Sequence, residues 1–421
     1  MMPSIEPSAA PSPPGIASPN RQRLDEVVVG RAVSFVAADF ASARPRIAAT
    51  LNGTRVLVIG GGGSIGGATV QLLSTFRPRA IHVIDASENY LADLVRNLRG
   101  RTEGLEVEDF RTLPLNYGSP LMRSFLEAAE PYDIVLNFAA LKHVRSEKDV
   151  YSLLQMIDTN VVCPARFKRW LRQYQHACSY FAVSTDKAAN PTSVMGASKR
   201  LMEDVTFAIR TCGDRANTSA RFANVAYSNG SLSAAFLERL ARRQPLAAPR
   251  DTSRYFMTQG EAAEICVLAA LAVPDGMVLI PRLDPRSQLR ELGVVAEQVL
   301  HAHGLRAVHY EDESAARRDV ERLARHGAWP LLLTPLDTSG EKPYEEFVGH
   351  AEHAEELGFA ALLGIRHLPG SGELDEVLEV LERMVTEPAV SLRKQDVVAL
   401  ISRAVPHFQH VETGRDLDQR L

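Results

Sequence analysis

The sequence predicts an α/β protein in which helices cover both faces of a parallel sheet. Short apolar runs rich in Val and Ile are typical of buried strands, and helix-forming segments at 68–76 and 87–99 follow two of them. Strands that alternate with helices in this way form a doubly wound parallel sheet of the Rossmann type. The candidate strands are residues 55–59, 80–85, 132–137 and 180–184.

The composition is that of an ordinary globular protein. The 421 residues are 45% hydrophobic and 23% charged, which allows a sizeable core. The formal net charge of -4 argues against a nucleic-acid partner, because phosphate binding favours a basic surface. The four cysteines are scattered without a C-x-x-C pair, which indicates buried thiols in a reducing compartment and no metal site.

No targeting or membrane-spanning segment is expected. Residues 1–20 are rich in Pro, Ser and Ala but lack the basic and apolar regions of a signal peptide. The apolar stretch at 265–273 ends at Pro274, well short of the roughly 20 residues that cross a bilayer. The sequence therefore predicts a cytoplasmic protein without a membrane anchor.

Glycines follow the first predicted strand directly. Their G-x-x-G-x-x-G spacing lets backbone N–H groups approach a pyrophosphate, which the positive end of the next helix also favours. Asp85 ends the second strand, where a carboxylate accepts hydrogen bonds from ribose hydroxyls and repels a 2′-phosphate. The pattern therefore favours NAD over NADP as the cofactor. The residues expected at the cofactor are Gly60, Gly63, Ser64, Ile65, Gly66 and Asp85.

This glycine spacing resembles that of the extended short-chain dehydrogenase/reductases. Residues 137–140, Asn-Phe-Ala-Ala, are similar to the N-A-A-type segment beside the cofactor in that superfamily, which implies contacts from Ala139 and Ala140. Asn160, in the run Asp-Thr-Asn-Val-Val, resembles the structural asparagine of the superfamily.

Four segments resemble the CapD-like polysaccharide-biosynthesis proteins, a family of nucleotide-sugar 4,6-dehydratases. Residues 141–144 look like the L-K-H-V signature, and residues 184–199 resemble the active-site segment almost residue for residue. Residues 254–258 and 340–346 look like two later landmarks of the family. The resemblance covers about residues 54–348.

The limits of this resemblance divide the chain. They imply a catalytic domain at 54–348, with a dinucleotide-binding core at about 54–230 and a smaller substrate-binding lobe at about 231–348. The flanking parts are expected to be a disordered tail at 1–23, a helical preface at 24–53 and a helical C-terminal extension at 349–421. The resemblance and this extension together imply a homo-oligomer.

The resemblance implies that a nucleotide-linked N-acetylhexosamine, such as UDP-N-acetylglucosamine, becomes its 4-keto-6-deoxy derivative for surface-glycan biosynthesis. In that reaction NAD takes a hydride from sugar C4, and the resulting ketone acidifies the C5 proton. A base removes this proton, an acid protonates the departing 6-hydroxyl, and the hydride returns to C6. An acid and a base must therefore lie close together.

Roles in this reaction carry over to four residues by resemblance. Thr185 matches the hydroxyl near the sugar 4-hydroxyl, Asp186 the acid and Lys187 the base at C5. Lys199 matches the lysine that holds the nicotinamide ribose. A lysine base must be neutral and an aspartic acid protonated, so the site must favour the uncharged forms. A simple Asp–Lys ion pair is the structural alternative.

Met195 stands where most short-chain dehydrogenases carry a catalytic tyrosine. Methionine has no titratable proton, so it cannot replace tyrosine as a base. Part of the dehydratase family also carries methionine here, beside the substrate. The acceptor of the 4-hydroxyl proton stays open between a Thr185–Asp186 relay and a water relay.

Other residues are implied at the substrate. Lys142 and His143 would line the sugar side of the cleft, although His143 is explained equally well as the cap of a strand end. Asn224, Arg254 and Glu341 match positions that hold the nucleotide and its pyrophosphate. A guanidinium suits phosphate, which favours Arg254 among the three.

Two arginines typical of the family are absent. Residues 228–231 read Ser-Asn-Gly-Ser and residues 338–339 read Thr-Ser, where the family usually carries a cation. These departures leave the nucleotide base open.

Two other functions fit parts of the pattern. Epimerisation or 5,6-dehydration of a nucleotide sugar shares the oxidation at C4 and the proton removal at C5. A non-catalytic NAD-binding scaffold would explain the missing tyrosine, but the four retained residues of the active-site segment argue against it.

Overall fold

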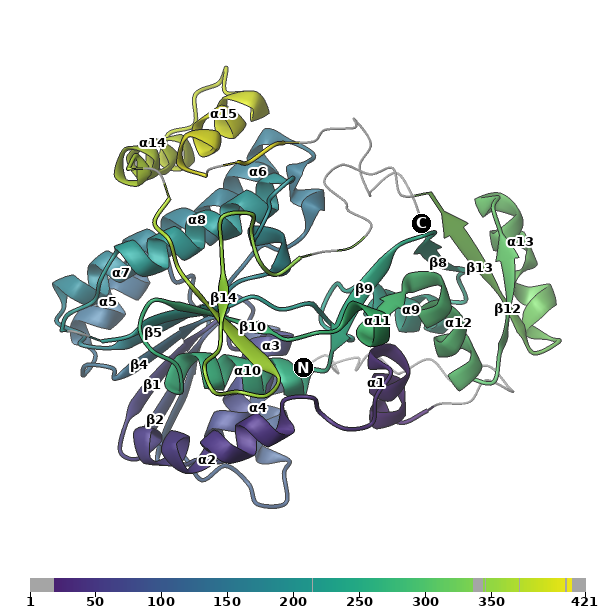
Figure 1. The fold of residues 1–421 in the computed structure, drawn as a ribbon, viewed down its shortest axis with the longest axis horizontal. Coiled ribbons are helices and arrows are strands. Elements are labelled where there is room, and N and C mark those ends of the chain that lie inside the picture. Colours follow the sequence, from purple (N-terminus) through teal and green to yellow (C-terminus); the bar gives the residue numbers. More distant parts are fainter. Residues whose placement is uncertain are drawn as a thin grey trace, which may run out of the picture.

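The computed structural model describes residues 19–213, 215–335, 344, 346–370, 372–405 and 407–410, without the side chains of residues 144 and 145. Figure 1 shows two lobes: a large one around a long sheet and a smaller one around β8, β12 and β13. Of the expected disordered tail, residues 1–18 lie outside the described part. Its last residues form the first turn of a helix, α1 (Arg21–Val29), which Asn20 caps.

The large lobe contains a nine-stranded sheet in the order β14-β15-β10-β6-β5-β4-β1-β2-β3. All neighbours from β10 to β3 are parallel, whereas β15 and β14 are antiparallel additions at one edge. This confirms the predicted doubly wound α/β fold, with the order 3-2-1-4-5-6 of Rossmann-type sheets. The strands are β1 (Arg55–Ile59), β2 (Ala80–Ile84), β3 (Asp109–Leu113), β4 (Ile134–Asn137), β5 (Ser179–Val183), β6 (Asn217–Ala220), β10 (Met277–Pro281), β14 (Ala354–Glu355) and β15 (Leu362–Arg366).

Helices cover both faces of this sheet because alternate strand residues point to opposite sides. Val56 and Val58 of β1 pack in one core with α2, α3, α4 and α10, whereas Leu57 and Ile59 pack in another with α5 and α7. The helix predicted at 68–76 begins four residues earlier, directly at the glycine turn. The helices are α2 (Ala37–Leu51), α3 (Ser64–Ser74), α4 (Glu88–Arg99), α5 (Pro120–Ala128), α6 (Val150–Ile157), α7 (Cys163–Gln173), α8 (Val194–Ala208) and α10 (Gln259–Leu271).

The smaller lobe is not the continuous segment expected at 231–348. The chain leaves this lobe for α10 and β10, which belong to the large sheet, and then returns. The expected helical preface is divided between the lobes. Its first helix, α1, packs against α12 of the smaller lobe, whereas α2 packs in the large lobe. Two three-stranded sheets, β12-β13-β8 and β11-β9-β7, complete the lobe. Its elements are β7 (Asn224–Val225), α9 (Leu232–Ala241), β8 (Leu246–Pro249), β9 (Ser253–Met257), α11 (Pro285–Gln288), β11 (Leu289–Glu291), α12 (Leu292–Ala302), β12 (Arg306–Tyr310), α13 (Glu313–Ala324) and β13 (Ala328–Thr334).

The C-terminal extension is not purely helical, which corrects the sequence prediction. Its first part forms β14 and β15, because β15 pairs with the otherwise open edge of β10 and satisfies the backbone groups there. Two helices follow, α14 (Leu374–Thr386) and α15 (Lys394–Ala404). Both pack over α6 and α8 in one apolar core.

Across the described ranges, no helix combines the length and apolar character that crossing a membrane requires.

Candidate active site

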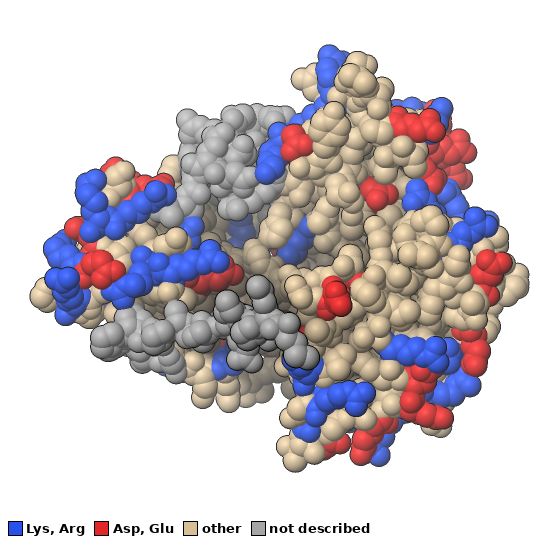
Figure 2. All heavy atoms as spheres, turned by 180° about the vertical axis from the view of Figure 1, so that it is seen from behind, with Lys and Arg blue, Asp and Glu red and all other residues tan. Residues whose placement is uncertain are grey.

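The candidate site lies where the strand order reverses. β1 and β4 are neighbours, but the chain leaves β1 toward β2 and leaves β4 toward β5, so their carboxyl ends open a crevice. Figure 2 shows a hollow between the two lobes, with Lys or Arg side chains visible inside it.

Two glycines of the turn after β1, Gly60 and Gly66, leave no room for a side chain. Gly60 has a φ of 70°, and a Cβ atom there would lie 2.6 Å from the backbone nitrogen of Ala139. A Cβ on Gly66 would overlap the carbonyl of Gly60. α3 then begins at Ser64, and its first-turn N–H groups have no partners inside the helix. The turn brings together the cofactor residues predicted from sequence and fits a bound pyrophosphate.

Asp85 follows β2 and lies beside this turn. Its Oδ2 accepts the N–H of Gly62 at 3.0 Å and its Oδ1 accepts the N–H of Ser87 at 2.9 Å. The carboxylate therefore joins the glycine turn to the end of β2, and each oxygen has lone-pair capacity left for ribose hydroxyls.

The segment after β4 is fixed by two asparagines. Asn137 Oδ1 accepts the N–H of Ala139 at 3.0 Å. Asn160 lies in a π-helical turn, Asp158–Val162, and both donates to and accepts from the backbone of Leu141 at 2.9 Å. Two hydrogen bonds to one residue fix the backbone that presents Ala139, Ala140 and the following Lys142.

Thr185, Asp186 and Lys187 form one hydrogen-bonded group directly after β5. Asp186 Oδ1 accepts the Thr185 hydroxyl at 2.7 Å, the N–H of Lys187 at 2.9 Å and Lys187 Nζ at 3.2 Å. Asp186 is 4% exposed, whereas the side chain of Lys187 is 24% exposed. The acid and base candidates are therefore in direct contact, and the lysine faces solvent more than the aspartate.

Lys199 lies buried below this group on α8. Its Nζ donates to the carbonyl of Val183, the last residue of β5, at 2.7 Å. Burial lowers the pKa of Lys199 to about 8, and the nearby charge of Glu203 opposes this shift. Lys199 is thus held against the strand end that carries the acid and the base.

Met195 lies in the first turn of α8 and is buried. Its N–H donates to Glu147 Oε1 at 3.0 Å, and Glu147 is itself buried. The sequence analysis missed Glu147. The sequence did offer one signal for Glu147, since it follows soon after the Lys142–His143 pair.

Lys142 and His143 lie against the loop at residues 228–230. Lys142 Nζ lies 3.5 Å from the hydroxyl of Ser228, and desolvation lowers the pKa of Lys142. The His143 ring borders Gly230. The N–H of Asn229 donates to Ser64 Oγ at 2.9 Å, so the loop that lacks the family arginine touches the cofactor turn.

Asn224 and Arg254 lie on neighbouring strands of the small sheet, β7 and β9, rather than at the end of β5. Asn224 Nδ2 lies 3.5 Å from the carbonyl of Tyr255, next to Arg254. Arg254 is buried, and its guanidinium donates to the carbonyl of Ser253. Glu341, the third residue expected at the nucleotide, lies outside the described residues, as do residues 338–339.

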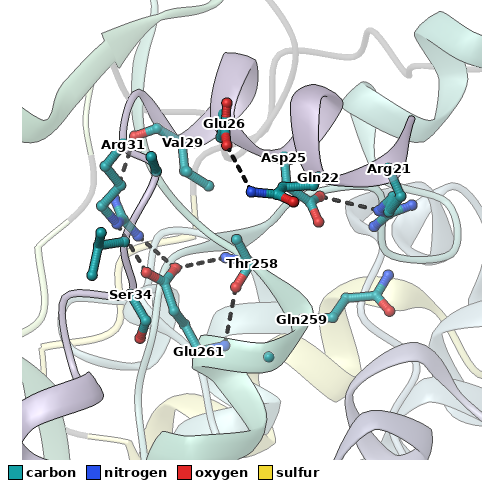
Figure 3. A pocket seen from close by; sticks show the side chains of 13 residues that line it. Arg21, Gln22, Asp25, Glu26, Val29, Arg31, Ser34, Thr258, Gln259 and Glu261 are labelled. Carbon is teal, nitrogen blue, oxygen red and sulfur yellow. Dashed lines mark hydrogen bonds and ion pairs between the residues drawn. The ribbon is translucent and has the colours of Figure 1, made fainter. Parts of the chain in front are cut away.

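A separate cavity of about 660 Å³ lies between α1 and the start of α10 (Figure 3). It contains none of the site residues predicted from sequence. Its charged side chains point toward one another: Arg31 binds Glu261 at 2.6 Å, and Arg21 binds Asp25 at 3.1 Å. The first pair joins the segment after α1 to α10, the second lies within α1, and we assign the cavity no part in the site.

The fold and the site together define an extended short-chain dehydrogenase/reductase. The model of a family described as polysaccharide biosynthesis protein matches residues 56–365, and this chain belongs to that family.

Several known proteins are similar to the chain. CapD, the capsular polysaccharide biosynthesis protein of Staphylococcus aureus, is 29% identical over 73% of this chain and 50% of its own length. MJ1061 of Methanocaldococcus jannaschii, an uncharacterized membrane protein, is 29% identical over 64% of this chain and 78% of its own. An inverting UDP-N-acetylglucosamine 4,6-dehydratase of Campylobacter jejuni is 24% identical over 55% and 68%. The chain therefore spans about half the length of CapD.

Two further similarities bear on fold and reaction. The solved structure of Pen from Bacillus thuringiensis shares the fold, with a TM-score of 0.60 and 21% identity over 80% of this chain and 99% of Pen. A UDP-glucose 4-epimerase of Rickettsia felis is 25% identical over 58% of this chain and 70% of its own length.

Proposed function

We propose that this chain is an NAD-dependent nucleotide-sugar 4,6-dehydratase that acts on UDP-N-acetylglucosamine or a closely related nucleotide sugar. The observation that carries the proposal is the Thr185–Asp186–Lys187 group, bonded together at the end of β5 beside the nucleotide crevice. The Campylobacter dehydratase and the polysaccharide family support this choice of reaction.

The residues present fit NAD. Gly60 and Gly66 allow the close backbone packing of a turn whose N–H groups would bind a pyrophosphate. Asp85, beside this turn, would bind the adenosine ribose, and Lys199 would bind the nicotinamide ribose. NAD bound there would accept a hydride from sugar C4 and return it to C6. A carboxylate at Asp85 disfavours the 2′-phosphate of NADP, because two anions would share one site.

The chain itself would supply the proton transfers. In the resting geometry Lys187 Nζ and Asp186 Oδ1 are 3.2 Å apart, so one proton can pass from the ammonium to the carboxylate. A sugar that fills the cleft and excludes water favours this uncharged arrangement, because desolvation penalises an ion pair. Lys187 would then remove the C5 proton, Asp186 would protonate the departing 6-hydroxyl, and the Lys187 ammonium would return a proton to C5 as the hydride reaches C6. The proton of the 4-hydroxyl would pass through the Thr185 hydroxyl or a water molecule to solvent, and a solvent proton would restore the Lys187–Asp186 ion pair. The Thr185 hydroxyl, bonded to the same carboxylate, would position the 4-hydroxyl.

The decisive experiment is incubation of the purified chain with UDP-N-acetylglucosamine, followed by mass and NMR analysis. A dehydratase removes one water and creates a C6 methyl group beside a C4 ketone. A 4-epimerase, which the Rickettsia similarity keeps as the second candidate, gives a product of unchanged mass. A 5,6-dehydratase loses water without forming a methyl group. Either of these outcomes would replace the proposed reaction.

We further propose that the protein acts in the cytoplasm as a homo-oligomer, in the synthesis of a surface polysaccharide. The family supports the pathway. GDP-N-acetylglucosamine should be tested beside the UDP sugar, because the loop at 228–231 lacks the family arginine.

A further inference from the structure

Helix α8 contacts the end of β5 and the residues that follow it at three points. Lys199 donates to the carbonyl of Val183, and the Ser184 hydroxyl donates to Glu203 Oε1 at 2.5 Å. A Cβ atom on Gly196 would lie 2.6 Å from the carbonyl of Lys187. Positions 196, 199 and 203 share one helix face, so α8 grips the residues on both sides of Thr185 and Asp186.

Glu203 is fully buried and is held from a distant part of the chain. Arg221, directly after β6 and also fully buried, donates to both oxygens of Glu203 at 2.8 and 2.6 Å. The same guanidinium donates to both oxygens of Glu352 at 2.5 and 2.8 Å. Burial raises the pKa of Glu203, but the charge and hydrogen bonds of Arg221 outweigh this and hold the pKa at about 2.

Arg200 joins the same network. It binds Glu352 at 2.5 Å and lies 3.8 Å from Glu203 and from Asp204. His367 Nε2 lies 3.0 Å from Asp204. Three buried carboxylates thus face two guanidinium groups and one histidine. Removing one member of such a network leaves its partners buried without compensation, so its geometry is tightly coupled.

The segment at 346–352 also contacts Ala189 and Asn190, which follow the Thr185–Lys187 group. Asn190 donates to Glu346 at 2.9 Å and accepts the N–H of His350 at 3.0 Å. A Cβ on Gly349 would lie 2.6 Å from the carbonyl of Ala189. The N–H of Gly349 donates to Glu352 at 2.8 Å, which orients the carboxylate toward Arg221.

We propose that Glu352 is a positioning residue of the active site. Through Arg221, Glu203 and Ser184 it holds the Thr185–Lys187 turn in place without touching the reacting atoms. Arg221, which follows β6, and the segment at 346–352 are thereby part of the site. The catalytic side of this inference rests on the proposed function.

The test compares two matched substitutions in the full chain, Glu352→Gln and Glu261→Gln. Each glutamate is buried, binds an arginine and accepts a backbone N–H at 2.8 Å, but Glu261 lies at the α1–α10 cavity and not at the catalytic turn (Figure 3). We expect Glu352→Gln to lower kcat about 10-fold or more with KM within about twofold, as for a lost positioning interaction. Glu261→Gln should leave kcat within about twofold.

Hydrogen–deuterium exchange provides a readout that does not depend on the reaction. Glu352→Gln should accelerate amide exchange at 183–190, whereas Glu261→Gln should not. If Glu352→Gln proves insoluble, Ser184→Ala removes only the hydroxyl that links Glu203 to the turn, and the same two changes are expected.

Two results would overturn the proposal: unchanged exchange at 183–190, or a loss of kcat no larger than in Glu261→Gln. If the wild-type chain converts no nucleotide sugar, the proposed function fails, while the exchange experiment still decides the positioning role.

Discussion

At the scale of single residues, the site depends on a short contact between an acid and a base of opposite charge. In the proposed reaction Lys187 and Asp186 act in their uncharged forms, yet they meet as an ion pair in the resting geometry. The two side chains differ in exposure, since that of Asp186 is 4% exposed and that of Lys187 is 24% exposed.

Lys187→Ala should separate the steps of the reaction. Without the base, the hydride can leave C4 but the C5 proton stays, so reduced nicotinamide should accumulate and solvent deuterium should not enter C5. Overall turnover should fall about 10²- to 10⁴-fold, the usual effect of a lost proton-transfer group. Absorbance of the reduced cofactor and NMR of the recovered sugar measure the two effects. If Lys187→Ala still exchanges the C5 proton at the wild-type rate, Lys187 has a structural role, and Lys142 or His143 becomes the candidate base.

Lys199 should make cofactor affinity depend on pH. Its pKa of about 8 means that the ammonium is charged below this pH and loses its proton above it. Since the charged form is the better donor to a ribose hydroxyl, NAD affinity should fall as pH rises through about 8. Calorimetric titration at pH 6.5 to 9.5 would measure this, with Lys199→Met as the matched variant without the titration. If NAD affinity changed with pH equally in both proteins, Lys199 would not be part of the cofactor site.

The residues of the site that could be predicted are those that follow one another in sequence. The group at 184–187 and Lys199 were singled out because the run 184–199 resembles the dehydratase active-site segment, and the glycine loop because of its spacing after a strand. Glu203 was within reach too, since it lies one helical turn after Lys199. Glu352 was not, because its contacts with Arg200 and Arg221 join segments more than 100 residues apart. Arg221 was not either, because its contact with Glu203 depends on the folded sheet that places β6 beside β5.

At the scale of elements, the C-terminal segment serves two purposes that its composition did not reveal. β15 closes the edge of the large sheet, and α14 with α15 covers apolar residues of α6 and α8. The strand was missed because two short strands give little period-2 signal, whereas the helices show a clear apolar stripe. The sequence analysis assigned no strands in the smaller lobe for the same reason, because most of its strands are also short.

Ending the chain at residue 370 should expose this apolar face while keeping β15 and Glu352. The uncovered residues include Leu153, Leu154, Leu201 and Val205. We expect a lower melting temperature together with self-association through the exposed face, measured by light scattering. A fully active, equally stable shortened chain of unchanged mass would contradict this. Ending the chain at residue 350 should lower the melting temperature further, because it also removes β15 and Glu352, one of the two carboxylate partners of Arg221.

At the scale of the whole molecule, bound NAD should stabilise the protein, since its proposed contacts come from β1, β2, β4 and α8. A ligand at 100 times its Kd adds about 2.7 kcal/mol to the free energy of unfolding. Thermal unfolding with NAD, NADP and no addition would test this. NAD should raise the melting temperature more than NADP, and Asp85→Ala should reduce that preference. Equal shifts with both dinucleotides in the wild type would remove Asp85 from the ribose site.

The two N-terminal helices, α1 and α2, contact parts of the chain that are made much later. α1 packs on α12, and Arg21 reaches the carbonyl of Ala226 at 3.3 Å. Asp39 of α2 accepts the N–H groups of Ala360 and Ala361 at 2.7 and 2.8 Å. During synthesis these helices emerge from the ribosome hundreds of residues before their partners exist. The apolar face of α1 must therefore stay exposed, or be bound by a chaperone, until the second lobe has been made, and the Asp39 carboxylate of α2 stays unpaired with its late partners until residues 360 and 361 have been made.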